Sequence, residues 1–179
     1  MGMEGLLEGL VRLDKLLNRY GIEYIVVGSL ADYLLGVPGV EPGDIDILVE
    51  EGNVEKLDAM IRSEKDIDIS ESIKWRECSI IKGLYGKILL DGVPVDIMAE
   101  LQIKYGDKWL SFTYEKLLPC TLEVDIDYSA TLRIPCPEIQ VIADKAMGRH
   151  ERARAIENII SRKKCGCNNR ILFNYPAAE

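Results

Sequence analysis

Three aspartates are the residues whose type and spacing best fit a chemical task. Asp44 and Asp46 are separated by one residue in an apolar stretch, and Asp96 lies in a second apolar stretch. On a β-strand, residues i and i+2 point to the same face with their Cα atoms about 6–7 Å apart. Both carboxylates would then project together while Ile45 and Ile47 face the core. If Asp96 lies on a neighbouring strand, it joins them on that face.

Three carboxylates held close together repel one another strongly unless protons or cations compensate their charge. Mg²⁺ is the natural compensation, because hard divalent cations prefer carboxylate oxygen. Two such ions, about 3.5–4 Å apart, are a known arrangement for in-line phosphoryl transfer. We therefore expect Asp44, Asp46 and Asp96 to be metal ligands, with two Mg²⁺ ions as the cofactor.

A Gly-Ser pair upstream of these carboxylates offers a site for phosphate. Gly28 and Ser29 follow the expected strand Tyr24–Val27 and precede an expected helix. Glycine lets a phosphate approach the backbone, and a helix N-terminus supplies free N–H donors and a favourable dipole. The serine hydroxyl adds a donor and can cap the helix. The sequence thus predicts a phosphate site close to the metal-binding face.

The string Asp-Ile-Asp occurs three times, so a bare match carries little weight. Only the copy at Asp44–Asp46 has an apolar strand and a Gly-Ser turn upstream and an apolar continuation downstream. The copy at Asp66–Asp68 lies in a charged stretch and predicts a solvated loop or sheet edge. The copy at Asp125–Asp127 lies beside an expected turn, where Asp is a common turn former. We assign function to the first copy.

Periodicity places these motifs on an α+β fold. The pattern predicts an N-terminal α-β-α-β unit on a mixed sheet, with strands in the middle third and one long helix near the end. The expected helices span 3–20, 30–35, 54–61 and 138–162, and the expected strands span 24–27, 45–49, 79–82, 86–90, 93–98, 122–126 and 130–134. Residues 104–120 predict no clear element, and the tail from 163 shows no periodicity, so we expect it to trail or pack loosely.

Composition and charge narrow the function classes. The 179 residues include 22 Lys and Arg, 30 Asp and Glu and one His, with a formal net charge of −8. This acidity argues against a coat-like nucleic-acid binder, and the single His excludes a site built from several histidines. Residues 138–179 are the exception, with 8 basic against 5 acidic residues. No apolar run has membrane-spanning length and no signal-peptide pattern is present, so we expect a cytoplasmic protein without a membrane partner.

Five cysteines, an odd number, lead us to expect reduced thiols rather than disulfides. Cys165 and Cys167 are too close together for a zinc knuckle of the C-x₂-C type. Few Gln with many Ile, Glu and Lys hint at a thermophilic prokaryote.

The order of these motifs resembles the nucleotidyltransferase superfamily typified by DNA polymerase beta. The resemblance is carried by the Gly28-Ser29 pair, by Asp44-Ile-Asp46-Ile and by Val-Asp96-Ile. It covers residues 20–100 firmly, and the stretch 137–160 loosely resembles a helix of small bacterial and archaeal members. Those relatives include the minimal nucleotidyltransferases and the toxins of type IV toxin–antitoxin systems. The implied architecture is a nucleotidyltransferase-type mixed sheet with flanking helices and a long C-terminal helix.

The resemblance also implies roles for the site residues. Asp44 and Asp46 would bind two Mg²⁺ with the triphosphate. Asp96 would bind the catalytic metal and help to activate the attacking hydroxyl, and Gly28 and Ser29 would hold the β- and γ-phosphates. Residues 1–137 would form the catalytic domain, and residues 138–179 would form a helix and tail that pack on it.

Two basic residues are further candidates for nucleotide binding. Lys145 and Arg149 lie four apart on the expected long helix, where they either meet phosphate or form an exposed basic face. Two departures from the family pattern concern the nucleotide and the acceptor. The basic residue that many relatives carry just before the first Asp is absent, and the helix motif ends in His150-Glu-Arg-Ala-Arg154 rather than Lys-Asp-x-x-Asp.

The expected reaction is transfer of a nucleoside monophosphate from a nucleoside triphosphate (NTP) to an acceptor hydroxyl, with release of pyrophosphate. The acceptor stays open between an RNA end, a protein hydroxyl and a small molecule. The alternative is a catalytically weak or inactive binding module on the same fold, including a toxin–antitoxin component. The Leu-rich N-terminal helix serves either as a packing element or as the contact of a homodimer.

Overall fold

The computed structural model describes residues 2–127, 129–162 and 170–173. The first part contains α1 (Met3–Arg19), β1 (Tyr24–Val27), α2 (Gly28–Leu35), β2 (Ile45–Val49), the 3₁₀ turn η1 (Glu51–Asn53) and α3 (Val54–Ser63). The second part contains β3 (Ile67–Glu77), β4 (Ile81–Leu90), β5 (Val93–Tyr105), β6 (Lys108–Ser111), α4 (Tyr114–Leu117) and η2 (Leu118–Cys120). The last part contains β7 (Thr121–Ile126), β8 (Ala130–Pro135), α5 (Pro137–Ala146), α6 (His150–Arg162) and β9 (Arg170–Phe173). The expected α+β class is confirmed.

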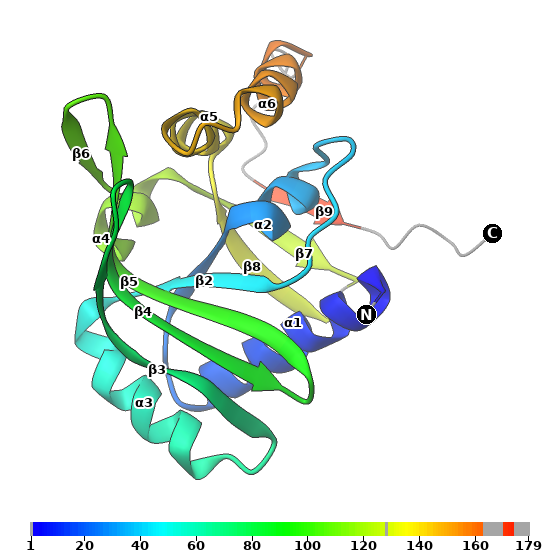
Figure 1. The fold of residues 1–179 in the computed structure, drawn as a ribbon. Coiled ribbons are helices and arrows are strands. Elements are labelled where there is room, and N and C mark those ends of the chain that lie inside the picture. The colour runs from blue at the N-terminus through cyan, green and yellow to red at the C-terminus, as the bar shows by residue number, and fades with distance from the viewer. Residues whose placement is uncertain (1, 128, 163–169, 174–179) are drawn as a thin grey trace.

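A mixed sheet forms the centre of the fold. Its strand order is β1-β2-β5-β4-β3, and β6 extends β5 at one end. Strands β2 and β5 are parallel, whereas the other pairs are antiparallel. A smaller sheet has the order β8-β7-β9. In Figure 1, α1 and α3 lie toward the lower side of the large sheet, and α5 and α6 lie together at the top.

The N-terminal helix supplies much of the hydrophobic core. Five leucines at helical spacing on α1 are at most 1% exposed: Leu6, Leu7, Leu10, Leu13 and Leu17. Full burial of such a side chain contributes about 1.5–3 kcal/mol to the hydrophobic driving force. These leucines pack in the same core cluster as the central strands. These leucines are therefore buried within the chain, where α1 serves as a packing element.

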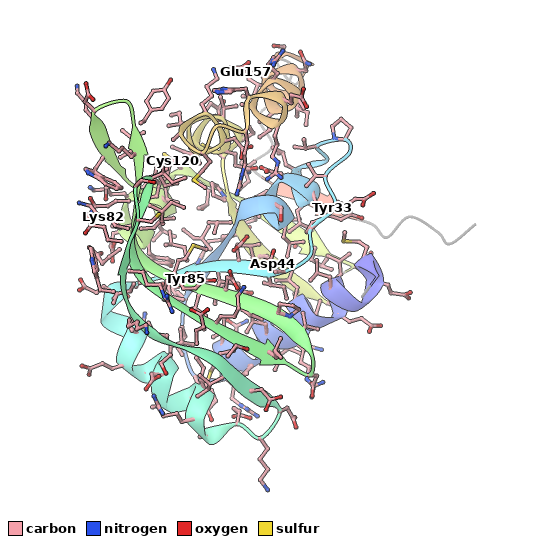
Figure 2. All side chains as sticks on the ribbon, in the orientation of Figure 1. Tyr33, Asp44, Lys82, Tyr85, Cys120 and Glu157 are labelled. Carbon is pink, nitrogen blue, oxygen red and sulfur yellow. The ribbon has the colours of Figure 1, made fainter. Side chains whose placement is uncertain are left out.

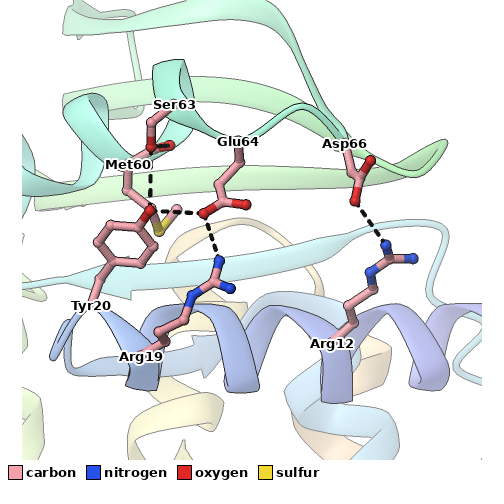
Figure 3. A network of polar contacts seen from close by, with 7 residues as sticks. All are labelled: Arg12, Arg19, Tyr20, Met60, Ser63, Glu64 and Asp66. Atoms are coloured by element: carbon pink, nitrogen blue, oxygen red, sulfur yellow. Dashed lines mark hydrogen bonds and ion pairs between the residues drawn. The ribbon is translucent and has the colours of Figure 1, made fainter.

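Polar contacts fix α1 against the connection between α3 and β3 (Figure 3). The Arg19 guanidinium and the Tyr20 hydroxyl both donate to Glu64 Oε1, at 2.5 and 2.8 Å. Two turns earlier in α1, Arg12 donates to Asp66 at 3.1 Å. The two arginine contacts are exposed, so they orient the helix more than they stabilise it.

The middle of the chain contains more strand than we expected. The charged stretch that begins at residue 66 leads into β3, whose eleven residues are mostly exposed. It is the edge strand of the sheet, so polar side chains are tolerated on both faces and no alternating pattern marks it. The segments expected at 79–82 and 86–90 belong largely to the single strand β4. Residues 104–120 contain the end of β5 together with β6, α4 and η2.

The long helix expected over 138–162 is wrong, because the structure has two helices there. Helix α5 ends at Ala146, and α6 begins at His150. Gly148 lies in the break with a φ of 73°, a left-handed conformation that glycine adopts at little cost. The Arg149 amide then donates to Asp144 O at 2.8 Å, which satisfies a carbonyl at the end of α5. Apolar periodicity continues through the break and concealed it.

The expectation of a loosely packed tail is wrong for residues 170–173. They form β9, which pairs in parallel with β7. Cys165 and Cys167 lie outside the described residues, and Cys78, Cys120 and Cys136 are free thiols.

No helix in the part of the chain that the structure describes is both long enough and apolar enough to cross a membrane.

Gly148→Ala tests the left-handed break between α5 and α6. A Cβ at φ 73° costs about 1–2 kcal/mol, although no atom lies within 4 Å of its position. We expect the free energy of unfolding to fall by that amount in urea titration. Gly52→Ala is the matched control, because Gly52 also has open space but no positive φ. Equal effects of the two substitutions would contradict the strain at Gly148.

Candidate active site

The register of three adjacent strands brings the predicted carboxylates together. Asp46 pairs with Asp96 across the parallel strands β2 and β5, and with Val27 across β1 and β2. Asp44 directly precedes β2. One carboxylate oxygen from each of Asp44, Asp46 and Asp96 lies within 4.8 Å of the other two. The three residues singled out from the sequence thus converge on one point.

Gly28 allows this convergence because it has no side chain. Its φ is 68°, and a Cβ at this position would lie 2.9 Å from Asp46 Cγ and closer still to Asp46 Oδ2. Gly28 is also the first residue of α2, and its N-cap, Val27, makes no side-chain capping hydrogen bond. The first N–H groups of α2 are therefore free to donate to an anion beside the carboxylates. The neighbouring Ser29 is partly buried.

The environment of Asp46 favours its protonated form. Burial, together with the charges of Asp44 and Asp96, raises the pKa of Asp46 to about 7. Arg149 and Lys87 act in the opposite direction and lower this pKa. Full ionisation of the cluster near neutral pH therefore requires an additional cation.

Two residues of β4, which we did not identify from the sequence, contact Asp96. The Tyr85 hydroxyl donates to Asp96 Oδ2 at 2.5 Å, and the Lys87 ammonium forms an ion pair with Oδ1 at 3.0 Å. Burial and the bond to Asp96 raise the pKa of Tyr85 to about 12, so it remains a donor. Asp96 Oδ1 is buried and, among the described residues, has no partner with hydrogen-bond geometry. Figure 2 labels Asp44 and Tyr85 within this arrangement.

A cavity of about 660 Å³ opens at the carboxylates. Gly28, Asp46 and Asp96 line one part of it. The remainder lies between β4, β5 and α5, so helices from the C-terminal part of the chain close over the site. The other two Asp-Ile-Asp copies lie elsewhere: Asp68 is exposed on the edge strand β3, and Asp125 on β7 accepts a hydrogen bond from Thr131 at 2.7 Å.

The fold and this geometry can be compared with known proteins. No protein-family model and no curated protein sequence significantly matches the chain. The candidate nucleotidyltransferase TM1012 from Thermotoga maritima superimposes with a TM-score of 0.69 at 22% identity, over 91% of this chain and 97% of that one. The chain has the nucleotidyltransferase fold. The antibiotic-resistance factor ANT(2'')-Ia is also similar, with a TM-score of 0.56 at 12% identity, over 92% of this chain and 88% of that one. Its complex with adenylyl-2''-tobramycin gives 0.53 at 11% identity, over 88% and 92%.

The acidic cluster of this nucleotidyltransferase fold fits a divalent cation. Its three donors are hard carboxylate oxygens within 4.8 Å of one another, which is the donor set that Mg²⁺ and Mn²⁺ prefer. Asp96 Oδ1 is buried without a hydrogen bond, and Gly28 leaves the space beside Asp46 free of side-chain atoms. The residues present therefore fit a divalent cation.

The two basic candidates have different surroundings. Arg149 lies in the break between α5 and α6, lines the cavity, and is 3.7 Å from Asp144 in an ion pair. Lys145 is on α5, where it donates to Glu157 of α6 at 2.6 Å, and it does not line the cavity. Figure 2 labels Glu157 on α6. The two residues are thus not on one helix face, and Arg149 is the one near the carboxylates.

A group of buried and half-buried charged side chains joins α2 to α5 and α6. Arg152 of α6 donates to Asp32 of α2 at 3.1 Å and lies 3.9 Å from Asp144 of α5. Burial, with the negative charge of Asp144, raises the pKa of Asp32 to about 7, whereas Arg152 and Arg149 lower it. Sequence reasoning missed this group, because Asp32 is more than a hundred residues away from Asp144 and Arg152 along the chain.

Gly28→Ala tests the close approach at the acidic cluster. The new Cβ displaces the Asp46 carboxylate, so we expect Mn²⁺ affinity to fall at least about tenfold in calorimetric titration. Gly36→Ala is the matched control, because Gly36 also has a positive φ but has open space at its Cβ position. Undiminished Mn²⁺ affinity in the Gly28 variant would contradict the site.

Asp32→Asn tests the buried charges through the pH dependence of stability. Because the folded-state pKa of about 7 exceeds the ordinary 3.8, the folded protein holds a proton that the unfolded chain releases. The free energy of unfolding therefore falls as the pH rises from about 4 to 7. The variant lacks this loss, so its stability relative to the wild type should rise over that range by a few kcal/mol at most, at about 1.4 kcal/mol per unit. Urea titrations from pH 4 to 8 measure this difference, and a flat one would contradict the assignment.

Proposed function

We propose that the chain is a Mg²⁺-dependent nucleotidyltransferase that transfers a nucleoside monophosphate from an NTP to an acceptor hydroxyl and releases pyrophosphate. The observation that supports it is the convergence of Asp44, Asp46 and Asp96 within 4.8 Å, directly beside the free N-terminus of α2. A triphosphate needs both parts, a cationic centre at the reacting phosphorus and N–H donors for the outgoing phosphates.

Each part of the site has a task in this proposal. Asp44, Asp46 and Asp96 would hold the ions, the first two together with the triphosphate. Bound Mg²⁺ would supply charge neutralisation at the reacting phosphate and would lower the pKa of the attacking hydroxyl. The N–H groups and hydroxyl of Gly28 and Ser29 donate to the β- and γ-phosphates.

In the reaction the acceptor oxygen forms a bond to the α-phosphorus, and the bond to the bridging oxygen of pyrophosphate breaks. The hydroxyl proton passes to Asp96 or to water. Tyr85 holds the Asp96 carboxylate through Oδ2 at 2.5 Å, which leaves Oδ1 for the reaction. Lys87 neutralises Asp96 before the substrates bind, since its ammonium is 3.0 Å from Oδ1.

The division of labour within the chain belongs to the same proposal. Residues 1–137 carry the carboxylates and the phosphate helix. From residues 138–179, α5 and Arg149 close the cavity over them, and Arg149 is placed to meet the triphosphate. The proposed setting is the cytoplasm, where NTP is abundant.

Asp44→Asn with Asp46→Asn tests the proposed reaction. We expect transfer of label from α-labelled ATP, with Mg²⁺ and pools of RNA, protein and small-molecule acceptors, to fall by more than about 100-fold. Loss of groups merely supporting a metal ligand already costs 10- to 100-fold. Asp68→Asn is the matched control, because it alters the same tripeptide on the exposed edge strand.

Two results would overturn this proposal. Transfer that persists in the double variant places the chemistry elsewhere. Binding of Mg²⁺ and a non-hydrolysable ATP analogue, combined with no release of pyrophosphate from ATP in any of the three acceptor pools, supports the alternative of a binding module on this fold.

A further inference from the structure

The cavity beside the carboxylates continues into an apolar chamber. Ile139 and Ala143 of α5 and its C-cap, Met147, are spaced four apart and line it from one side. Leu84 of β4 and Met98 and Leu101 of β5 line it from the other side. All six pack against the hydrophobic core but are only partly buried, so part of each side chain borders the cavity. A well-packed interior leaves few such voids, and apolar walls around one indicate a ligand site.

Unpaired polar atoms in the same lining give a second, independent indication. Within the described residues, three buried side-chain atoms lack a hydrogen bond: Asp96 Oδ1, Gln140 Oε1 and Asp144 Oδ2. All three belong to residues that line this cavity. Asp96 Oδ1 still has the Lys87 ammonium 3.0 Å away, so Gln140 Oε1 and Asp144 Oδ2 are the acceptors that carry the cost of an unmade hydrogen bond, about 1–3 kcal/mol each. A ligand that carries hydrogen-bond donors would remove this cost.

The surroundings of Gln140 and Asp144 show why one acceptor of each is left over. Gln140 is 5% exposed, and its Nε2 donates to Pro135 O at 2.6 Å, which leaves Oε1. Asp144 is 4% exposed, and its Oδ1 lies 3.7 and 3.9 Å from Arg149 and Arg152, which leaves Oδ2. The two residues are four apart on α5, on a row next to the apolar one.

We propose that this chamber binds the acceptor, and that the acceptor is a small uncharged molecule with an aliphatic body and several hydroxyl groups. This inference rests on the proposed function and names the substrate class of the same site. The hydroxyls pair with the acceptors of α5, one of them reaches the carboxylates, and the aliphatic part contacts the six apolar side chains. The chamber is one part of a cavity of about 660 Å³, a volume within the range of small-molecule sites.

The charges and rings around the chamber favour this class over the other acceptors. An RNA end needs cations along its phosphates, but the cations of the cavity lining are Lys74 and Arg76 of β3 and Arg149, and the six side chains of the chamber are apolar. The aromatic rings of Trp75 and Tyr85 also come from β3 and β4. A nucleobase stacks on such rings, so the aliphatic chamber is left to the acceptor.

Methionine methyl resonances test the chamber without any nucleotide or metal. Met98 and Met147 line it, whereas Met60 belongs to α3 and is buried in the core. In protein labelled with ¹³C at the methionine methyls, n-octyl β-D-glucoside below its micellar concentration should shift the Met98 and Met147 signals and leave Met60 unchanged. Glucose at the same concentration should shift none of the three.

A pair of variants on one helix separates filling of the chamber from general damage. Ala143→Trp occupies the chamber and should weaken octyl glucoside binding at least about tenfold, equivalent to about 1.4 kcal/mol. Ile142→Trp is the control on the outer face of α5, since Ile142 is 43% exposed and does not line the cavity, and it should bind as the wild type does. Both variants should keep the wild-type Met60 signal, which reports that the core is folded.

The outcomes distinguish this inference from the proposed function. Absence of Met98 and Met147 shifts with octyl glucoside, equal shifts with glucose, or shifts of the same pair with adenosine each overturn the acceptor assignment. Asp46→Asn should retain the methyl shifts although transfer is lost. Methyl shifts in a protein that shows no transfer would contradict the proposed function alone.

Discussion

Electrostatic repulsion among Asp44, Asp46 and Asp96 is the constraint around which the rest of the structure is arranged. Their oxygens lie within 4.8 Å of one another, a separation that isolated carboxylates in a chain would avoid. Backbone hydrogen bonding between β1, β2 and β5 enforces it, because the register fixes Asp46 opposite both Asp96 and Val27. Burial of the Asp46 carboxylate and then the charges of Asp44 and Asp96 raise the pKa of Asp46, whereas the cations Arg149 and Lys87 lower it.

The C-terminal helices place positive charge near the three carboxylates from the other side of the cavity. The left-handed Gly148 ends α5 early and places Arg149 beside the cavity instead of on a continuous helix. Arg149 then lowers the pKa of Asp46 and forms an ion pair with Asp144. Arg152 forms ion pairs with both Asp144 of α5 and Asp32 of α2. The position of α5 over the cavity is thus coupled through charge to the helix that faces the carboxylates. The charges of Asp144 and Arg152 accordingly change the pKa of Asp32 in α2.

Sequence patterns predicted the part of the site that is set by local rules. Alternation and the upstream Gly-Ser turn separated Asp44–Asp46 from its two copies, which lie on an edge strand and on the small sheet. The position of Lys87 next to Asp96 could also have been predicted from the sequence. The Asp91-Gly92 turn pairs Leu90 with Val93, and the same antiparallel register sets Lys87 opposite Asp96. The members of the Asp32, Asp144 and Arg152 group could not be found, because no short-range pattern links side chains that meet only through the packing of α2, α5 and α6. The edge strand β3 lacked a pattern because neither of its faces is strictly buried.

Two buried aspartates, Asp14 and Asp144, differ in how completely their carboxylate oxygens are hydrogen-bonded. Asp14 is 7% exposed, and its Oδ1 accepts hydrogen bonds from both Tyr24 and Asn18, so this buried carboxylate is compatible with the surrounding core. Asp144 is buried to a similar degree, yet one of its oxygens is left unpaired beside the cavity. Folding alone does not require that difference, because an apolar residue of similar size would avoid the cost. Within the part of the chain that the structure describes, the buried side-chain acceptors without a hydrogen bond all belong to residues of the cavity lining, which is where donors carried by a substrate would meet them. This common location supports the proposal that α5 and the acidic cluster contribute to one binding site.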